Sequence, residues 1–322
     1  MRALMLAQTL QWTDCPAPEP RPGEALIRVR MAGICNTDLE LLRGYAQFRG
    51  IPGHEFVGEV VCAPDAPEWV ARRVVGEINV ACGACHMCRA GYPTHCLDRE
   101  ALGIRGRAGA FAEYLTLPVR NLHTVPQALP DDVAVFTEPL AAACEILEQV
   151  HVHPSDRVVV IGDGKLGLLC AQVLSLTGCD VTLLGHHREK LDIVARMGIE
   201  TALRAGTLAS GADVVVEATG HPGGYAAAQR LVRPRGSVVL KSTYHGDFQS
   251  DLTTAVVDEV TLIGSRCGPF APALRLLGRG LVDVRPLIHA RYAFDDALAA
   301  FDHAARPGAL KVLLDFEDGE TV

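Results

Sequence analysis

Four of the eleven cysteines in this chain of 322 residues lie within one short stretch, in the pattern C-x2-C-x2-C-x7-C. They are Cys82, Cys85, Cys88 and Cys96. Four thiolates so close together are typical of a structural zinc site, in which the protein supplies all four ligands. In the ferredoxin pattern of iron–sulfur proteins, about three residues separate the last two cysteines and proline follows. Here seven residues separate them and Leu97 follows, so the pattern predicts zinc.

Two further segments have metal-ligand side chains beside glycines. Cys35 comes after Gly33, and His54 and Glu55 come directly after Gly53. Cysteine, histidine and glutamate all bind zinc in proteins. Taken singly, a cysteine is more often a buried apolar side chain and a histidine more often a structural one. These segments therefore gain meaning only from the motifs that accompany them.

A glycine-rich loop lies between an apolar run at 158–161, predicted to be a strand, and a helical pattern at 168–176. In the G-x-G-x-x-G fingerprint, the first glycine makes a tight turn and the second lets a pyrophosphate approach the backbone. The third lets helix and strand pack closely. This context predicts a dinucleotide-binding loop. Its residues are Gly162, Gly164, Lys165, Leu166 and Gly167.

The end of the next predicted strand, at 181–184, indicates which dinucleotide binds. An NAD site usually has an acidic residue there, which accepts hydrogen bonds from the ribose hydroxyls. This chain continues instead with Gly185, His186, His187 and Arg188. Gly185 leaves room for a 2′-phosphate, and the arginine with one or both histidines provides positively charged donors. The segment therefore predicts that NADP is favoured over NAD.

The predicted elements divide the chain into two kinds of structure. Up to about residue 140, short β-rich runs are broken by glycine and proline, as in a partly open barrel. Five later β-rich runs alternate with helical or turn segments, which predicts an α/β fold with a doubly wound parallel sheet. These runs are at 157–161, 180–184, 212–217, 236–240 and 260–264. A helix at 294–305 and a strand at 310–316 are expected near the end of the chain.

The composition excludes several classes of protein. A mean hydropathy of +0.18, with no run of about 18 uncharged apolar residues, argues against a membrane span. A net charge of −8 without a basic stripe argues against a nucleic-acid partner. An odd number of cysteines argues against a disulfide framework. Because the first residues lack a signal-like apolar run, we expect a cytoplasmic protein without a membrane partner.

In their order along the chain, these motifs resemble the zinc-containing medium-chain dehydrogenase/reductase family, which includes the alcohol, sorbitol and threonine dehydrogenases. The resemblance extends through essentially the whole chain and includes the turn Thr137-Glu138-Pro139-Leu140. It implies a GroES-like β-barrel catalytic domain around a Rossmann domain, with the active site in the cleft between them. It also implies two zinc ions per chain, a homodimer or homotetramer, and hydride transfer between a nicotinamide cofactor and an alcohol or carbonyl compound.

The expected domain boundaries follow from the elements and the resemblance together. Residues 1–142 are expected to form the catalytic domain, with the cysteine lobe at about 82–96. Residues 143–280 are expected to form the dinucleotide-binding domain, and residues 281–322 to return to the catalytic domain.

The resemblance assigns the catalytic zinc ligands. Cys35 and His54 match two of them, and Glu138 has the position of the third. Alcohol dehydrogenases with a Cys₂His site have cysteine at that third position. A glutamate there resembles the sorbitol and threonine branches, which favours a secondary alcohol, a polyol or a sugar alcohol as substrate. Glu55 or a water can complete the ligand shell, so Glu138 binds either directly or through water.

Three further residues are assigned through the resemblance. Thr37 matches the hydroxyl that relays the proton from the zinc-bound oxygen. Thr219 follows the predicted strand at 212–217, at the edge of the sheet where nucleotides bind, and Lys311 matches a basic residue near the pyrophosphate.

Three charged residues have open roles. Glu40 stands where many alcohol dehydrogenases have a relay histidine, and it is either a proton shuttle or a solvated residue of a helix. Arg105 and Arg107 either meet an anionic substrate or face water.

Two other classes of function explain part of the sequence. A zinc-free quinone or enoyl reductase shares the fold and the glycine loop, but it needs neither Cys35 and His54 nor the cysteine lobe. A non-enzymatic zinc module explains the four-cysteine lobe alone and leaves the glycine loop without a role. Two zinc ions per chain would favour the dehydrogenase over both.

Overall fold

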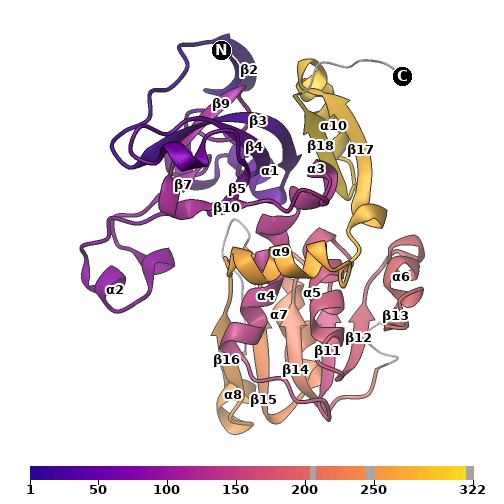
Figure 1. Ribbon diagram of the computed structural model, residues 1–322. Coiled ribbons are helices and arrows are strands. Elements are labelled where there is room, and N and C mark those ends of the chain that lie inside the picture. The colour runs from indigo at the N-terminus through magenta and orange to yellow at the C-terminus, as the bar shows by residue number, and fades with distance from the viewer. Residues whose placement is uncertain (204–207, 244–250, 317–322) are drawn as a thin grey trace. The chain divides into compact units, whose positions relative to one another are not determined.

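The computed structural model describes residues 1–203, 208–243 and 251–316. The chain divides into two compact units (Figure 1). Unit 1 consists of Met1–Glu138 and Leu287–Val322, and unit 2 of the intervening Pro139–Pro286. Among the described helices, none combines the length and the apolar character that a membrane crossing requires.

The core of unit 1 is a seven-stranded sheet in the order β10-β5-β4-β3-β18-β17, with β9 also paired to β3. Its strands are β3 (Glu24–Ile34), β4 (Glu55–Cys62), β5 (Arg73–Gly76), β9 (Tyr114–Pro118), β10 (Leu122–Thr124), β17 (Ile288–Ala293) and β18 (Lys311–Asp315). The long strand β3 pairs antiparallel with β4, β9 and β18. The last part of the chain is therefore joined to the first part through β18.

Smaller elements complete unit 1. The strands β1 (Arg2–Leu6) and β2 (Leu10–Asp14) pair with each other, and β6 (Asn79–Val80), β7 (Glu100–Leu102) and β8 (Gly106–Arg107) form a three-stranded sheet. The helices are α1 (Asn36–Leu42), α2 (His86–Arg89), α3 (Asp131–Ala134) and α10 (Ala297–Ala304). Five single 3-10 turns lie at Tyr45–Gln47, Pro67–Trp69, Pro93–His95, Val119–Asn121 and Phe294–Asp296.

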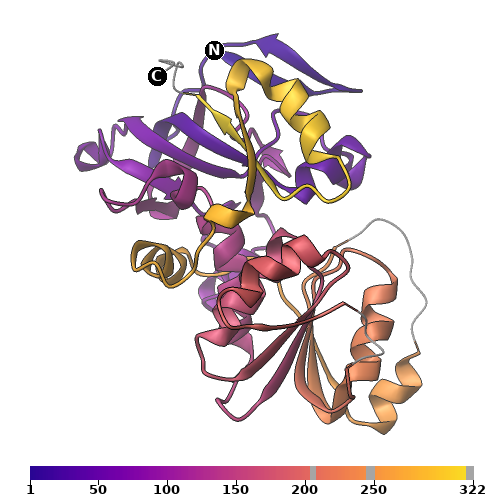
Figure 2. The ribbon, with the colours of Figure 1, turned by 90° about the vertical axis from the view of Figure 1, so that its right-hand side faces the viewer.

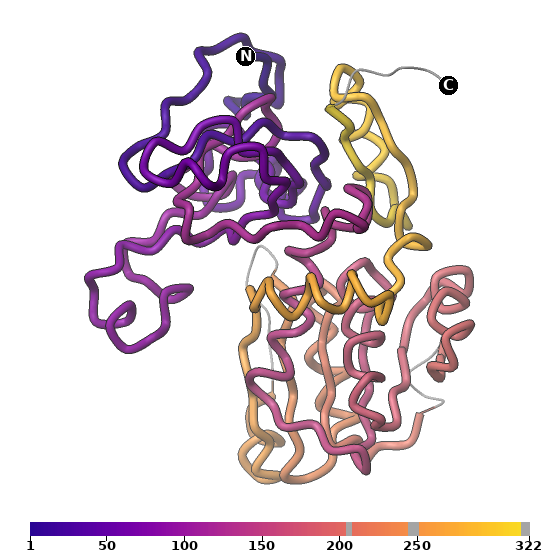
Figure 3. The backbone as a smooth tube through the Cα atoms, viewed as in Figure 1, coloured from indigo at the N-terminus to yellow at the C-terminus, as the bar shows by residue number. Residues whose placement is uncertain are grey.

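The four-cysteine segment leaves unit 1 as a lobe around α2, visible in the backbone trace (Figure 3). It begins after β6 and ends before β7, and these two strands are antiparallel partners. The lobe therefore starts and finishes at the same place.

Unit 2 is a six-stranded parallel sheet with helices on both faces (Figure 2). The strands are β11 (Arg157–Ile161), β12 (Asp180–Leu184), β13 (Glu200–Ala202), β14 (Ala212–Glu217), β15 (Val232–Leu240) and β16 (Thr261–Gly264). Their order in the sheet, β13-β12-β11-β14-β15-β16, is the order 3-2-1-4-5-6 of a dinucleotide-binding fold. The predicted α/β doubly wound sheet is confirmed, although the short strand β13 was not expected.

The helices of unit 2 alternate with these strands. They are α5 (Lys165–Ser175), α6 (Arg188–Ala195), α7 (Gly223–Leu231), α8 (Leu252–Val257) and α9 (Phe270–Gly278), and α4 (Thr137–Gln149) enters the unit from Glu138. A 3-10 turn at Arg285–Leu287 spans the point where the chain passes from unit 2 back to unit 1. All residues of β11 after Arg157 are buried, as expected for a central strand covered on both faces.

Candidate functional site

The four cysteines of the lobe lie close enough together to hold one metal ion, since their Sγ atoms are all within 4.8 Å of one another. The Sγ atoms of Cys85 and Cys88 are 3.5 Å apart, and those of Cys85 and Cys96 are 3.8 Å apart. A disulfide bond would require about 2.05 Å. Four sulfurs at about 2.3 Å from a zinc ion lie about 3.8 Å from one another, so the observed spacing fits zinc.

Backbone amides in the lobe favour the thiolate forms that a metal needs. The amides of Ala84 and Cys85 donate to the Sγ atom of Cys82 at 3.4 and 3.3 Å. Backbone donors likewise lower the pKa of Cys85 to about 6. Burial and the sulfurs of Cys85 and Cys96 raise the pKa of Cys88 to about 12. Sulfurs that repel each other's charge in this way are stabilised by a cation in their midst.

A second cluster of ligand atoms lies in the sheet of unit 1. The ligand atoms of Cys35, His54 and Glu55 all lie within 4.8 Å of one another. Cys35 directly follows β3 and precedes α1, while His54 directly precedes β4. Because β3 and β4 pair antiparallel, with Gly33 opposite Glu55, the end of one strand meets the start of the other. The sheet register therefore brings together three of the four predicted ligands, and Glu138 is not part of this cluster.

Asp38 orients the histidine of this cluster. The Oδ1 atom of Asp38 lies 3.3 Å from Nδ1 of His54, and its Oδ2 atom accepts a hydrogen bond from the amide of Cys35 at 2.8 Å. With Nδ1 facing Asp38, Nε2 is the ring nitrogen left for a metal. Burial lowers the pKa of His54, but Asp38 and Cys35 raise it well above its usual value. Sequence reasoning missed Asp38, although a carboxylate three residues after Cys35 was the available signal.

Lys311 lies beside this cluster. It is only 1% exposed, and its Nζ atom donates to Oε2 of the fully buried Glu55. Burial lowers the pKa of Lys311, whereas Glu55, Cys35 and Glu138 raise it overall. The strand β18 thus carries this side chain into the core of unit 1, beside a carboxylate. The contact of Lys311 with the cofactor phosphates stays a prediction.

Gly33 makes room for this pair. A Cβ atom at position 33 would overlap the Glu55 carboxylate and lie 3.3 Å from Cδ of Lys311. The other oxygen of Glu55, Oε1, is buried and accepts no hydrogen bond from the residues that the structure describes. A buried carboxylate oxygen without a donor is costly, and a bound cation would satisfy it. The donor set therefore fits a zinc ion.

The other residues predicted near this zinc lie on α1 and α4. The Oγ1 atom of Thr37 is 3.8 Å from Sγ of Cys35, so the hydroxyl lies beside a ligand. Glu138 belongs to the first turn of α4 and is close enough to affect the pKa of Lys311. Glu40 forms an ion pair with Arg43 at 2.6 Å, which favours the interpretation of Glu40 as a residue of the helix surface.

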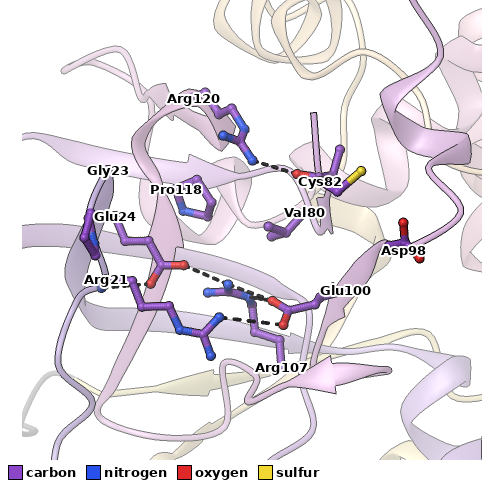
Figure 4. Close-up of a pocket in the computed structure, with 12 residues that line it drawn as sticks. Arg21, Gly23, Glu24, Val80, Cys82, Asp98, Glu100, Arg107, Pro118 and Arg120 are labelled. Carbon is purple, nitrogen blue, oxygen red and sulfur yellow. Dashed lines mark hydrogen bonds and ion pairs between the residues drawn. The ribbon is translucent and has the colours of Figure 1, made fainter. Parts of the chain in front are cut away.

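Arg107, predicted to meet an anionic substrate or water, does neither. Its side chain is 8% exposed and forms ion pairs with Glu24 at 2.7 Å and Glu100 at 2.8 Å (Figure 4). These residues line a hollow of about 320 Å³ that also includes Cys82. Arg107 therefore joins β8 to β3 and β7, whereas Arg105 is exposed.

In unit 2, the glycine loop has the close contacts that its three glycines predict. Gly162 has a φ of +117°, and a Cβ atom there would lie 2.5 Å from the carbonyl oxygen of Ala218. A Cβ atom at Gly167 would overlap the carbonyl of Gly162, whereas one at Gly164 would meet no atom within 4 Å. Lys165 and Leu166 form the start of α5 and are half-buried. The backbone at Gly164 is thus open to a ligand.

The turn at 185–188 is hydrogen-bonded to a carboxylate that the sequence prediction did not consider. Asp163, the second residue of the glycine loop, accepts hydrogen bonds from the amides of His186 and His187 at 2.6 and 2.7 Å. Nδ1 of His187 lies 3.0 Å from the same Oδ2 atom. Arg188 begins α6 and is exposed. Of the side chains expected to face a 2′-phosphate, the ring of His187 therefore already faces a carboxylate.

The hydroxyl of Thr219 is also engaged. Thr219 is the second residue after β14, and its hydroxyl donates to Oε1 of Glu217 at 2.5 Å. The amide of Thr219 donates to the same oxygen at 2.8 Å. Glu217 is 3% exposed at the carboxyl end of β14. Thr219 thus lies at the predicted edge of the sheet, but its hydroxyl is held by a neighbouring side chain.

Two protein families match the chain. The Alcohol dehydrogenase GroES-like domain matches residues 21–127, and the Zinc-binding dehydrogenase family matches residues 166–278. The chain is 33% identical to L-threonine 3-dehydrogenase of Streptomyces avermitilis, over 94% of this chain and 95% of that protein. It is 32% identical to erythritol/L-threitol dehydrogenase of Mycolicibacterium smegmatis, over 83% of each.

Solved structures show the same similarity. A protein from Escherichia coli CFT073, described as a short chain alcohol dehydrogenase and complexed with NADH, superposes with a TM-score of 0.91 at 26% identity. That superposition covers 98% of this chain and 99% of the other. A zinc-binding dehydrogenase from Sinorhizobium meliloti 1021 bound to NADP gives a TM-score of 0.89 at 27% identity, over 98% of each chain.

Proposed function

The chain belongs to the zinc-dependent medium-chain dehydrogenase family, and from this premise we propose that it oxidises a secondary alcohol group of a polyol or a sugar alcohol. Membership makes the chain a nicotinamide-dependent oxidoreductase acting on alcohols and their carbonyl products. The family predicted from the sequence is thereby confirmed. The polyol preference is supported by Glu138 at the start of α4 and by relatives that act on erythritol, threitol and threonine.

The buried cluster of Cys35, His54 and Glu55 is the observation that carries this proposal. A zinc ion held there would act as a Lewis acid toward the substrate oxygen. Two neighbouring side chains position the ligands of this cluster. Asp38 fixes the ring of His54, and Lys311 holds the carboxylate of Glu55. The Thr37 hydroxyl, beside Cys35, is placed to pass on the proton that the alcohol loses. Glu138 is proposed as the further ligand, bound directly or through water.

The four-cysteine lobe is proposed to hold a second zinc that stabilises the protein and takes no part in catalysis. Four cysteine ligands would complete the tetrahedral shell of a zinc ion, so a metal there would have no open position for substrate. Two zinc ions per chain are therefore expected.

Variants of the two clusters test the proposal. Cys35→Ala and His54→Ala should each remove one zinc per chain and reduce kcat by at least about a thousandfold, with little change in Tm. Cys88→Ala should also remove one zinc, but it should lower Tm while the remaining folded protein keeps its activity. The measurements are the metal content by mass spectrometry, the Tm, and the NAD(P)-linked turnover of a panel of polyols.

Each alternative function has its own outcome in this experiment. A protein without zinc that reduces quinones or enoyl compounds would support the zinc-free reductase. A protein with one removable zinc and no nicotinamide-linked turnover would support the non-enzymatic module. Normal kcat in Cys35→Ala would contradict the assignment of the catalytic centre.

We also propose that the protein is a homodimer or a tetramer built from such dimers. The strand β16 forms one edge of the parallel sheet in the described part of unit 2, and Leu262 on it is exposed. In the nearby helix α8, Leu252, Val256 and Val257 are exposed as well. An open strand edge with apolar neighbours is suited to pairing with a second copy. Light scattering of Leu262→Lys should then show a smaller assembly.

The cysteines support the proposed location in the cytoplasm. None of the eleven forms a disulfide, and four make up a zinc lobe that oxidation would destroy. Such thiols persist in a reducing compartment.

A further inference from the structure

The carboxylate of Asp163 occupies the place where an NAD-binding fold usually has its ribose-binding acid. That acid normally stands at the end of the second strand, which is β12 here. The chain has Gly185 at this position, and a Cβ atom there would lie 2.5 Å from Oδ2 and 2.8 Å from Cγ of Asp163. The carboxylate of Asp163, from the glycine loop, therefore lies where the side chain of a residue at the end of β12 would be.

This carboxylate is fixed in position by three donors. Its Oδ2 atom accepts hydrogen bonds from the amides of His186 and His187, and the ring of His187 lies at 3.0 Å. Asp163 is 7% exposed. Burial raises the pKa of Asp163, but these donors lower it below its usual value, so the group is charged at neutral pH.

The arrangement has opposite consequences for the two dinucleotides. A ribose 2′-hydroxyl can donate to Oδ1 of Asp163, which accepts no hydrogen bond from the part of the chain that the structure describes. A 2′-phosphate would bring two negative charges beside this carboxylate. The amides of His186 and His187, which would otherwise be donors for the phosphate, are already used.

We propose that Asp163, from the glycine loop, is the residue that receives the ribose hydroxyl and excludes the 2′-phosphate, so that this site prefers NAD to NADP. The inference rests on the proposed function only in that unit 2 must bind a nicotinamide dinucleotide. It replaces the preference for NADP that Gly185 and Arg188 predicted from the sequence alone.

The test compares NADH and NADPH binding without any alcohol, by the fluorescence of the reduced nicotinamide. The unaltered protein should bind NADH at least about tenfold more tightly than NADPH. Asp163→Asn, which keeps the size of the side chain and removes its charge, should shift the ratio of the two Kd values toward NADPH by at least about tenfold. Tighter binding of NADPH by the unaltered protein would overturn the inference.

A double variant separates the role of the charge from its position. Asp163→Gly combined with Gly185→Asp returns the acid to the end of β12 and removes the whole side chain, Cβ included, that would collide with a Cβ at position 185. It should restore the preference for NADH that Asp163→Gly alone loses. Failure to restore it, in a protein with normal Tm and circular dichroism, would count against a ribose-binding carboxylate.

The variant Arg188→Ala tests the prediction from the sequence, in which Arg188 binds the 2′-phosphate of NADP. If Asp163 determines the choice, this variant should change the ratio of Kd values by less than about twofold, because Arg188 is exposed. A selective loss of NADPH binding in Arg188→Ala, with an unchanged ratio in Asp163→Asn, would overturn the inference. Binding of both cofactors without preference would also overturn it while leaving the proposed function intact. Binding of neither would overturn both.

Discussion

At the scale of single residues, the candidate metal centre consists of buried charges that fix one another. Asp38 faces His54, and Lys311 faces Glu55, all of them less than 4% exposed. An unpaired buried charge is costly, so each partner restricts the position of the other. These pairings leave Sγ of Cys35, Nε2 of His54 and Oε1 of Glu55 for a metal.

Removing the charge of Asp38 should weaken the catalytic zinc. Asn at this position still accepts the hydrogen bond from the amide of Cys35, but it no longer attracts the His54 ring. We expect Asp38→Asn to lower zinc affinity by about 10- to 100-fold, as for other partners of metal-binding histidines. Competition with a chromophoric chelator measures this. Asp302→Asn, an exposed substitution on α10, is the control and should retain full affinity.

Asp163 should make unit 2 sensitive to acid. Its pKa is lower in the folded protein than in the unfolded chain, so the unfolded chain binds the extra proton. The stabilisation is therefore present above about pH 4, the usual aspartate pKa, and is lost as the pH falls below it. Urea denaturation should show wild type more stable than Asp163→Asn at pH 7, with the difference shrinking toward pH 3. A difference that stays constant with pH would contradict the assigned charge.

At the scale of elements, Arg107 joins three strands that are separate in sequence. Its guanidinium contacts Glu24 of β3 and Glu100 of β7, and Nη1 donates to the carbonyl of Thr116 on β9 at 3.1 Å. The cysteine lobe ends just before β7, so this contact also fixes one end of the lobe.

Removing Arg107 should therefore destabilise unit 1. Arg107→Ala leaves the buried carboxylate of Glu24 without its partner, which costs about 3–5 kcal/mol in comparable cases. The free energy of unfolding, measured by chemical denaturation, should fall by this amount. Arg105→Ala, at the exposed arginine two residues earlier, should change it by less than about 0.5 kcal/mol. Equal effects in the two variants would contradict the structural role of Arg107.

The glycine loop has two glycines that are needed for different reasons. Gly167 must lack a side chain because α5 and the loop touch there, whereas Gly164 faces open space. We expect Gly167→Ala to lower the Tm of unit 2, and Gly164→Ala to keep Tm but weaken NADH binding by at least about tenfold, because a methyl group would block the pyrophosphate. Calorimetry and NADH fluorescence separate the two effects. Equal loss of Tm in both variants would show that Gly164 is structural as well.

At the scale of the whole molecule, the two metal clusters belong to unit 1 and the glycine loop belongs to unit 2. Unit 1 is assembled from both ends of the chain, since β18 pairs with β3. Unit 2 forms its own parallel sheet between them. Metal binding and dinucleotide binding therefore depend on different cores.

Removal of zinc should separate these two properties. Treatment with a strong chelator should abolish turnover, while the Kd for NADH should change by less than about threefold, because no described residue of unit 2 belongs to either cluster. Fluorescence titration before and after treatment measures this, and restored zinc should restore turnover. Loss of NADH binding together with zinc would show that the two units depend on each other.

The sequence by itself determined the motifs and the class of fold. Ligand types, glycine spacing and the alternation of strands and helices are local properties, and they identified the four-cysteine lobe, Cys35 with His54, and the doubly wound sheet. The tertiary structure alone decided where charged side chains end up. Lys311, Arg107 and Asp163 each meet a partner across a sheet or between two loops, and such partners depend on strand register, which spacing along the chain does not reveal.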